Sequence, residues 1–301
     1  MRSFPHKRIY FCSMLVLAMI SAMGQSDEPP YYGTIYVDSN IVSPRDRGTF
    51  GGIEYSGKTV YNGWDARIPG WRDINAFAYN VPWRDHPNCM GMVDTAFVDL
   101  DSAYVLVEFY ARAIGRIPLS LRAGVKGFCI QGGDSLFSMS FDSILNIHHG
   151  QGLILIKDGI LEEALVHEGV HAGLDPTYAE SPQWVAAQKA DVRFISNYAA
   201  ENPKTEDLAE CALFWIALKY VPWRLTEEES STINATIPHR LKFLDKIPFN
   251  EHPMEWDSEE GPTDAPMDAR MDPVTEQTEV GARKAPRRIP CGGRIGPPPP
   301  R

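Results

Sequence analysis

Apolar positions recur along the chain at two different spacings, which predict strands in some regions and helices in others. Short alternating or β-branched runs are typical of strands, and they cover residues 34–37, 59–61, 76–79, 124–130, 143–148 and 153–157. Helical spacing predicts four helices, over about residues 101–114, 160–174, 182–199 and 205–220. We expect Asp101 and Ser102 to cap the first helix and Ser181 the third. This order of elements predicts an α+β domain in which a helix packs across a small sheet.

The two ends of the chain differ in composition from the part between them. Residues 1–24 combine basic residues, an apolar run over 9–20, and the small residues Ala22 and Gly24 before an expected cut. This pattern predicts a secretory signal peptide, because the run is too short to favour a membrane anchor. After about residue 248 the chain becomes rich in proline and poor in aromatic residues, so we predict a disordered tail over 249–301.

Net charge and cysteine content limit the classes of partner and the cellular compartment that the sequence favours. The 301 residues carry a formal charge of −10, so the whole chain has no electrostatic basis for binding nucleic acid. No apolar run after the N-terminus is long enough to span a membrane. In a secreted protein the cysteines that remain after the signal are expected to form disulfides, with the pairing left open. These are Cys89, Cys129, Cys211 and Cys291, and Asn234 begins a glycosylation sequon.

A His-Glu-x-x-His motif lies on the second predicted helix. His167 and His171 are four residues apart, so a helix places both imidazoles on one face, where they can bind one metal ion. Glu168 follows the first histidine and can reach a water molecule on that metal without binding the metal itself.

A catalytic zinc site usually takes a third protein ligand and keeps one position open. Glu206 and Glu210 are again four residues apart on a predicted helix. We expect Glu206 to bind the metal and Glu210 to hold a ligand imidazole by its other nitrogen. Asp175, Asp191 and Glu210 itself are the alternative ligands, and an acidic helix start that faces solvent is the alternative for Glu206.

Further polar and aromatic side chains near the motif have simpler interpretations. We expect Glu163 to face solvent, with bracing of the site as the alternative, and Trp184 to pack in the core. His148 and His149 are adjacent on a predicted strand, so they point to opposite faces and are not expected to share a metal.

Residues 100–225 resemble the gluzincin branch of the zincin metallopeptidases, including lethal-factor-type and related secreted peptidases. The resemblance rests on His167-Glu168-x-x-His171, on Glu-Asp-Leu-Ala-Glu over 206–210, and on Tyr198 shortly before it. It implies a zincin-like catalytic domain over 96–248. The residues before it are rich in Tyr, Gly, Pro and Trp and contain short alternating runs, which predict a β-rich segment over 25–95. The resemblance also implies that strand 143–148 binds the substrate backbone.

The sequence thus predicts a secreted zinc metallopeptidase that acts on a peptide or protein substrate. One Zn²⁺ held by His167, His171 and Glu206 would activate water, with Glu168 as the general base. Tyr198 would donate a hydrogen bond to the oxyanion, and a core tyrosine is the alternative for it. The alternative function is a secreted zincin-fold binding protein without catalytic turnover.

Overall fold

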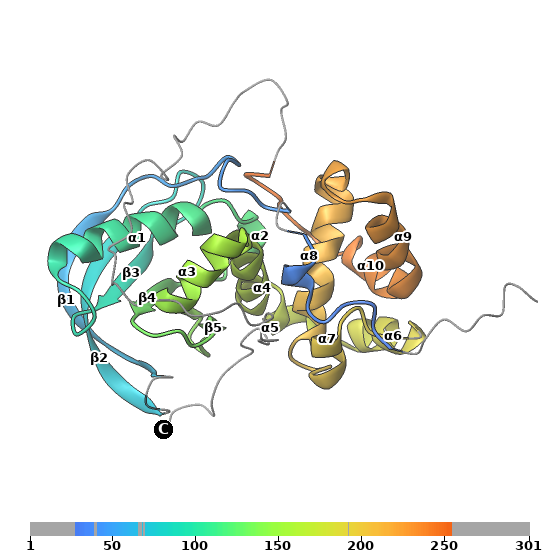
Figure 1. Ribbon diagram of the computed structural model, residues 1–301, viewed down its shortest axis with the longest axis horizontal. Coiled ribbons are helices and arrows are strands. Elements are labelled where there is room, and N and C mark those ends of the chain that lie inside the picture. The colour runs from blue at the N-terminus through green and yellow to red at the C-terminus, as the bar shows by residue number, and fades with distance from the viewer. Residues whose placement is uncertain (1–27, 39–40, 66–67, 69, 192, 255–301) are drawn as a thin grey trace, which may run out of the picture.

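The computed structural model describes residues 28–254, apart from 39–40, 66–67, 69 and 192. The expected signal peptide, the expected tail after residue 254 and Cys291 lie outside the described residues. Within the described part, the protein has an α+β fold with a mixed sheet in one half and helices packed across and beside it (Figure 1). The predicted fold class is therefore confirmed.

The sheet has six strands in the order β1-β2-β3-β4-β6-β5. The strands are β1 (Glu54–Trp64), β2 (Trp71–Val81), β3 (Cys89–Asp94), β4 (Gly127–Gln131), β5 (Ser138–Met139) and β6 (Ile144–His148). Strands β1, β2 and β3 pair antiparallel, β3, β4 and β6 pair parallel, and β5 pairs antiparallel to β6 at the edge. The β-rich segment expected over 25–95 thus forms one continuous sheet with strands of the expected catalytic domain.

Helices surround the sheet and form the other half of the molecule (Figure 1). They are α1 (Leu100–Ile114), α2 (Leu119–Arg122), α3 (His149–Asp158), α4 (Leu161–Gly173), α5 (Asp175–Tyr178), α6 (Pro182–Ala190), α7 (Asn197–Glu201), α8 (Asp207–Tyr220), α9 (Glu227–Thr236) and α10 (Pro238–Leu244). Two short 3₁₀ helices, η2 (Thr34–Tyr36) and η3 (Pro222–Arg224), complete the elements. Helix α1 packs on strands β2 and β3, while α10 packs on α8 and is itself contacted by α6 and α9.

Helix α4 lies at the centre, between α1 and α3 on the sheet side and α8 on the other. Nearly every residue of α4 is buried, including its charged ones, so each polar side chain on it needs a partner inside the protein. At its C-terminal end the helix rests against the backbone of α2. A Cβ atom on Gly173 would lie 2.3 Å from the carbonyl oxygen of Ser120, so only glycine allows this approach.

Several predicted elements differ from the structure. The strand predicted over 153–157 is part of helix α3, because a short apolar run has no periodicity that separates a strand from a buried helix. The run at 34–37 is the 3₁₀ helix η2. The helix predicted over 182–199 ends at Ala190 and a separate helix, α7, begins at Asn197. Helices α9 and α10 were not predicted.

Helix caps and the start of the tail also bear on the predictions. Ser181 caps α6 as expected, whereas Asp99, and not Asp101 or Ser102, accepts the capping hydrogen bond of α1. Residues 249–254, the first part of the expected tail, are packed against the start of α2. The carbonyl oxygen of His252 accepts from the Leu119 backbone N–H at 2.7 Å.

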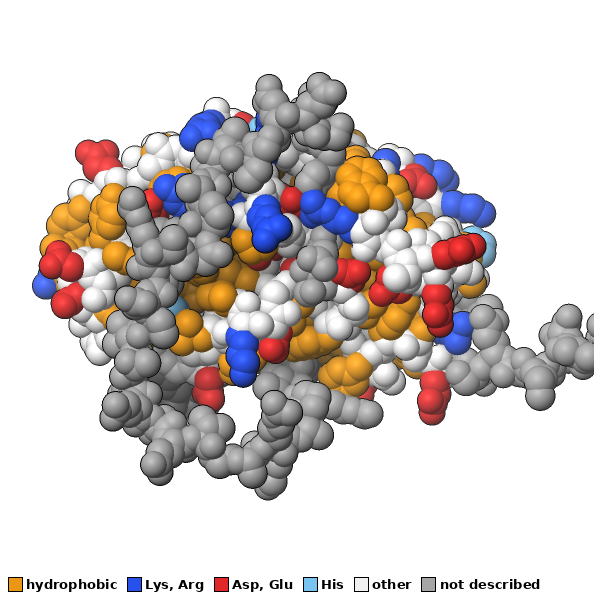
Figure 2. All heavy atoms as spheres, turned by 45° about the horizontal axis from the view of Figure 1, so that its top comes forward, with side chains coloured by type: hydrophobic (Ala, Val, Ile, Leu, Met, Phe, Trp, Pro, Cys, Tyr) orange, Lys and Arg blue, Asp and Glu red, His pale blue; other side chains and the backbone are white. Residues whose placement is uncertain are grey.

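The thiols of Cys89, Cys129 and Cys211 are each buried, and no disulfide joins them. None of the helices in the described ranges is both long and apolar enough to cross a membrane. On the face shown in Figure 2, charged side chains of both signs are spread out, with hydrophobic side chains exposed between them.

Candidate metal centre

Helix α4 carries the His-Glu-x-x-His motif into the centre of the protein. His167 and His171 are fully buried, and their ring centroids lie 5.0 Å apart on successive turns. The predicted helix and the shared face of the two imidazoles are therefore observed. Trp184 is buried against Phe243 as expected.

Glu206 is the residue just before α8, and its side chain extends to the two imidazoles. Its Oε2 lies 3.2 Å from Nε2 of His167 and 3.4 Å from Nε2 of His171. One ligand atom from each of these three buried residues lies within 4.8 Å of the others. Two imidazole nitrogens and one carboxylate oxygen thus converge, and the group could hold a metal ion.

Two further carboxylates lie beside the outer nitrogens of the imidazoles, and that of Asp175 makes a hydrogen bond there. Oε1 of Glu210 lies 3.2 Å from Nδ1 of His167, and Oδ2 of Asp175 lies 2.7 Å from Nδ1 of His171. A carboxylate on the outer nitrogen fixes the tautomer and leaves Nε2 facing the centre. Glu210 occupies the place expected for it, and Asp175 braces an imidazole instead of joining the three converging atoms.

The second alternative ligand, Asp191, points into a different cluster. Its Oδ2 lies 3.0 Å from Nη1 of Arg240, and its Oδ1 lies 2.9 Å from Nδ1 of His239. Both oxygens are therefore engaged away from the histidines of α4. The expectation that Glu163 faces solvent is wrong, because this side chain is buried and its Oε1 accepts the Val42 backbone N–H at 3.1 Å.

The cluster shifts the pKa values of its members in opposite directions. Burial would lower the pKa of His167, but hydrogen bonding to Glu206 and Glu210 outweighs burial and raises it to about 9. Burial would raise the pKa of Glu206, yet the two imidazoles hold it well below its ordinary value. Glu168 differs, because burial raises its pKa to about 7 and the imidazoles offset this only in part.

Buried polar atoms that make no hydrogen bond test whether these residues fit a metal ion. Oε2 of Glu168 and Nε2 of His171 are buried and make no hydrogen bond within the described residues. Buried polar atoms without a partner are costly, so they point to a group that would occupy the space they face. Imidazole nitrogens and a carboxylate oxygen are donors that divalent transition metals accept, so the residues present fit such an ion.

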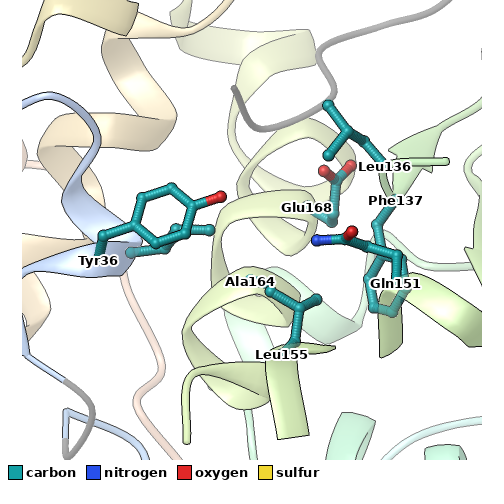
Figure 3. A pocket seen from close by; sticks show the side chains of 8 residues that line it. Tyr36, Leu136, Phe137, Gln151, Leu155, Ala164 and Glu168 are labelled. Atoms are coloured by element: carbon teal, nitrogen blue, oxygen red, sulfur yellow. The ribbon is translucent and has the colours of Figure 1, made fainter. Parts of the chain in front are cut away.

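A pocket lies against Glu168 (Figure 3). It is a shallow hollow, half open to solvent, and the space in it that a water molecule can occupy is about 10 Å³. Much of its wall is apolar, with Phe137 before β5, Leu155 on α3 and Ala164 on α4, and Tyr36 of η2 lies opposite Glu168. Ala164 and Glu168 are four residues apart, so the pocket opens on the side of α4 that carries Glu168.

The structure places Tyr198 near the cluster at the start of α7. Its ring centroid lies 6.2 Å from that of His167, and the residue is 9% exposed. Its ring therefore packs beside a motif imidazole. His148 is the last residue of β6, and its Nδ1 lies 3.2 Å from the carbonyl oxygen of Leu136. His149 is the first residue of α3, and its Nδ1 lies 3.0 Å from the hydroxyl of Tyr110. The two rings therefore have different partners.

The strand expected to bind substrate is not at the edge of the sheet. Strand β6 is paired with β4 on one side and β5 on the other, so its backbone is already hydrogen-bonded. The edge beside α4 belongs to β5, which contacts α4 directly. Two residues are too few to produce a periodic pattern, which is why this strand was missed.

Sequence reasoning also missed residues that the N-terminal segment brings to the site. Tyr36 lines the pocket, and the Thr34 backbone N–H donates to Oε2 of Glu210 at 2.9 Å. Ser196 donates to the same oxygen at 2.5 Å. No spacing rule connects residue 34 with residue 210, so no local signal could have found these contacts.

No protein-family model matches the chain, and neither a curated protein nor a solved structure matches it. The interpretation of the site therefore rests on its own geometry.

Proposed function

We propose that this protein is a secreted zinc-dependent metallopeptidase. The observation that carries the proposal is the buried convergence of His167, His171 and Glu206, with Glu168 beside them in a pocket. Two imidazoles and a carboxylate that leave one position open are the ligand set of catalytic zinc sites that hydrolyse peptides. Secretion rests on the sequence of residues 1–24.

The three ligand residues would hold the ion, and a bound Zn²⁺ would supply Lewis acidity that polarises a carbonyl and acidifies water. Glu168 would accept a proton from the attacking water and deliver it to the amine that leaves. Its position in the pocket beside the motif imidazoles suits both steps, and burial raises its pKa above the ordinary value in the metal-free protein.

The surroundings of Glu168 support a peptide as the substrate. The apolar wall of the pocket suits an aliphatic or aromatic side chain next to the bond that is cut. Tyr198 beside His167 is the expected donor to the oxyanion.

The test uses the purified protein without its signal peptide. We expect about one zinc ion per chain by elemental analysis, and cleavage of a denatured protein mixture that stops with a chelator and returns with zinc. Glu168→Gln should retain zinc and lose cleavage. Glu163→Gln is the matched control, because it changes a buried carboxylate on the same helix that does not line the pocket, and it should retain both.

Each other outcome has a defined meaning. Zinc binding without cleavage by the unmodified protein would support the binding-protein alternative. Cleavage that survives both the chelator and Glu168→Gln would contradict the metallopeptidase.

A further inference from the structure

The N-terminal segment at residues 31–36, which we call the strap, is attached to the helices that form the metal centre. Tyr31 bridges to Ser196, and its carbonyl oxygen accepts the Asn197 backbone N–H at 2.9 Å. The next carbonyl, of Tyr32, accepts the Tyr198 backbone N–H at 3.1 Å. The strap therefore runs along the start of α7, close to the predicted ligands.

The strap is also held by a carboxylate of the centre itself. Oε2 of Glu210 accepts the Thr34 backbone N–H, while Oε1 of the same group lies beside His167. Hydrogen bonds to an ionised carboxylate are among the stronger ones in proteins. Thr34 and Ile35 are buried, so η2 is fixed in place by packing as well as by this bond.

This attachment presents the Tyr36 side chain to the pocket. The phenol ring lies against Gly33, where a Cβ atom would be only 3.4 Å from Cδ2 of Tyr36. Its hydroxyl points toward the side of the pocket formed by Glu168 (Figure 3). The side chain remains 42% exposed, so a bound molecule can reach it.

We infer that Tyr36 contacts the substrate and determines which side chain the pocket accepts. This inference rests on the proposed function and adds to it a specificity residue from outside the helical half that carries the motif. The Tyr36 ring forms one wall of the pocket, and the other walls belong to α3, α4 and the segment before β5. Changing its volume should therefore change the preferred size of the substrate side chain while the zinc ligands remain in place.

The experiment compares the zinc-loaded protein with Tyr36→Ala, Tyr36→Phe and Tyr36→Trp. Peptides that differ only in the residue next to the scissile bond, carrying leucine or naphthylalanine, are compared by kcat/KM. Binding of peptide hydroxamates with the same two side chains is measured by calorimetry, and the zinc content of each variant is determined. Tyr55→Ala is the matched control, because Tyr55 is similarly exposed at 44% and does not line the pocket.

We expect Tyr36→Ala to shift the naphthylalanine-to-leucine ratio upward by about tenfold, and Tyr36→Trp to shift it downward, in both cleavage and binding. Tyr36→Phe and Tyr55→Ala should leave the ratio unchanged, and every variant should retain zinc. Unchanged ratios in Tyr36→Ala and Tyr36→Trp with cleavage intact would overturn the inference while the proposed function stands. Loss of zinc in Tyr36→Ala would also overturn it, because the residue would then act on the centre. If the unmodified protein cleaves nothing, the proposed function fails and the inference fails with it.

Discussion

Glu206 and Asp207 are consecutive residues that belong to two different buried charge clusters, and the clusters differ in the source of their positive charge. Glu206 turns toward the imidazoles of α4, whereas Oδ2 of Asp207 accepts hydrogen bonds at 2.9 Å from both Arg240 and Gln188. Arg240 also pairs with Asp191, so one guanidinium holds two carboxylates.

The difference lies in where the positive charge comes from. The second cluster, which we call the arginine cluster, contains a permanent cation. In the first cluster Glu206, Glu210 and Asp175 surround two imidazoles, and no lysine or arginine of the described chain pairs with them. Buried carboxylates need a compensating charge. One cluster is therefore a structural ion pair with a permanent cation, whereas the other takes its positive charge from imidazoles that the carboxylates hold protonated, and it could hold a metal ion in their place.

The largest expected effect comes from removing the built-in cation. Arg240→Met leaves two carboxylates buried without their partner and should lower the free energy of unfolding by about 3–5 kcal/mol. Urea denaturation measures this, and added zinc should not restore the loss. Arg112→Met, which breaks the partly exposed pair with Glu108, should cost less than about 1 kcal/mol. Equal losses in the two variants would contradict the structural role of the arginine cluster.

Adding zinc should have the next largest effect on stability. Zinc at one hundred times its dissociation constant should stabilise the folded protein by about 2.7 kcal/mol, because it binds the folded state alone. Thermal denaturation with and without zinc measures the shift. Glu206→Ala should abolish it, and a shift that persists in this variant would show that Glu206 is not a ligand.

The carboxylates of the two clusters should differ in their effect on zinc. Asp175→Asn weakens the hold on the outer nitrogen of His171 and should reduce zinc affinity by about 10–100-fold. Asp191→Asn should leave zinc affinity unchanged and destabilise the fold, because its partner is Arg240. Metal titration of both variants tests this. Complete loss of zinc in Asp175→Asn, with zinc retained in Glu206→Ala, would make Asp175 the third ligand.

The last expected effect depends on pH and concerns Glu163, a buried carboxylate that accepts a backbone N–H and forms no ion pair within the described residues. Burial raises its pKa from 4.5 to about 8, so the folded state favours the protonated form. The stability it contributes is present at acidic pH and is lost as pH rises toward 8. Relative to Glu163→Gln, the unfolding free energy should fall by at most about 1.4 kcal/mol per pH unit between about pH 5 and 8. A pH-independent difference would contradict this.

The parts of the molecule that the sequence predicted are those governed by local spacing. Helical period alone places His167 and His171 on one face, and the same spacing brings Glu206 and Glu210 to the two nitrogens of His167. Strand β4 and strand β6 were also predicted, since their apolar runs are bounded by turn residues. The α+β class followed from the order of these elements.

The parts that were missed depend on contacts between distant segments. The two residues of β5 are held as a strand by pairing with β6. Residues 153–157 lie in helix α3, although their apolar run alone is equally compatible with a strand. Tyr36 enters the pocket because Thr34 is bonded to a residue 176 positions away. The burial of Glu163 likewise depends on Val42, which no local pattern reveals.

The contact between Gly173 and the backbone of residues 120–121 has a mechanical consequence. The contact is lateral, because the face of α4 that carries Gly169 and Gly173 lies directly against α2. The two main chains therefore fix how closely α4 approaches α2, and with it the position of both imidazoles. A larger residue at position 173 would push the helix sideways, and His171 lies only two residues before it.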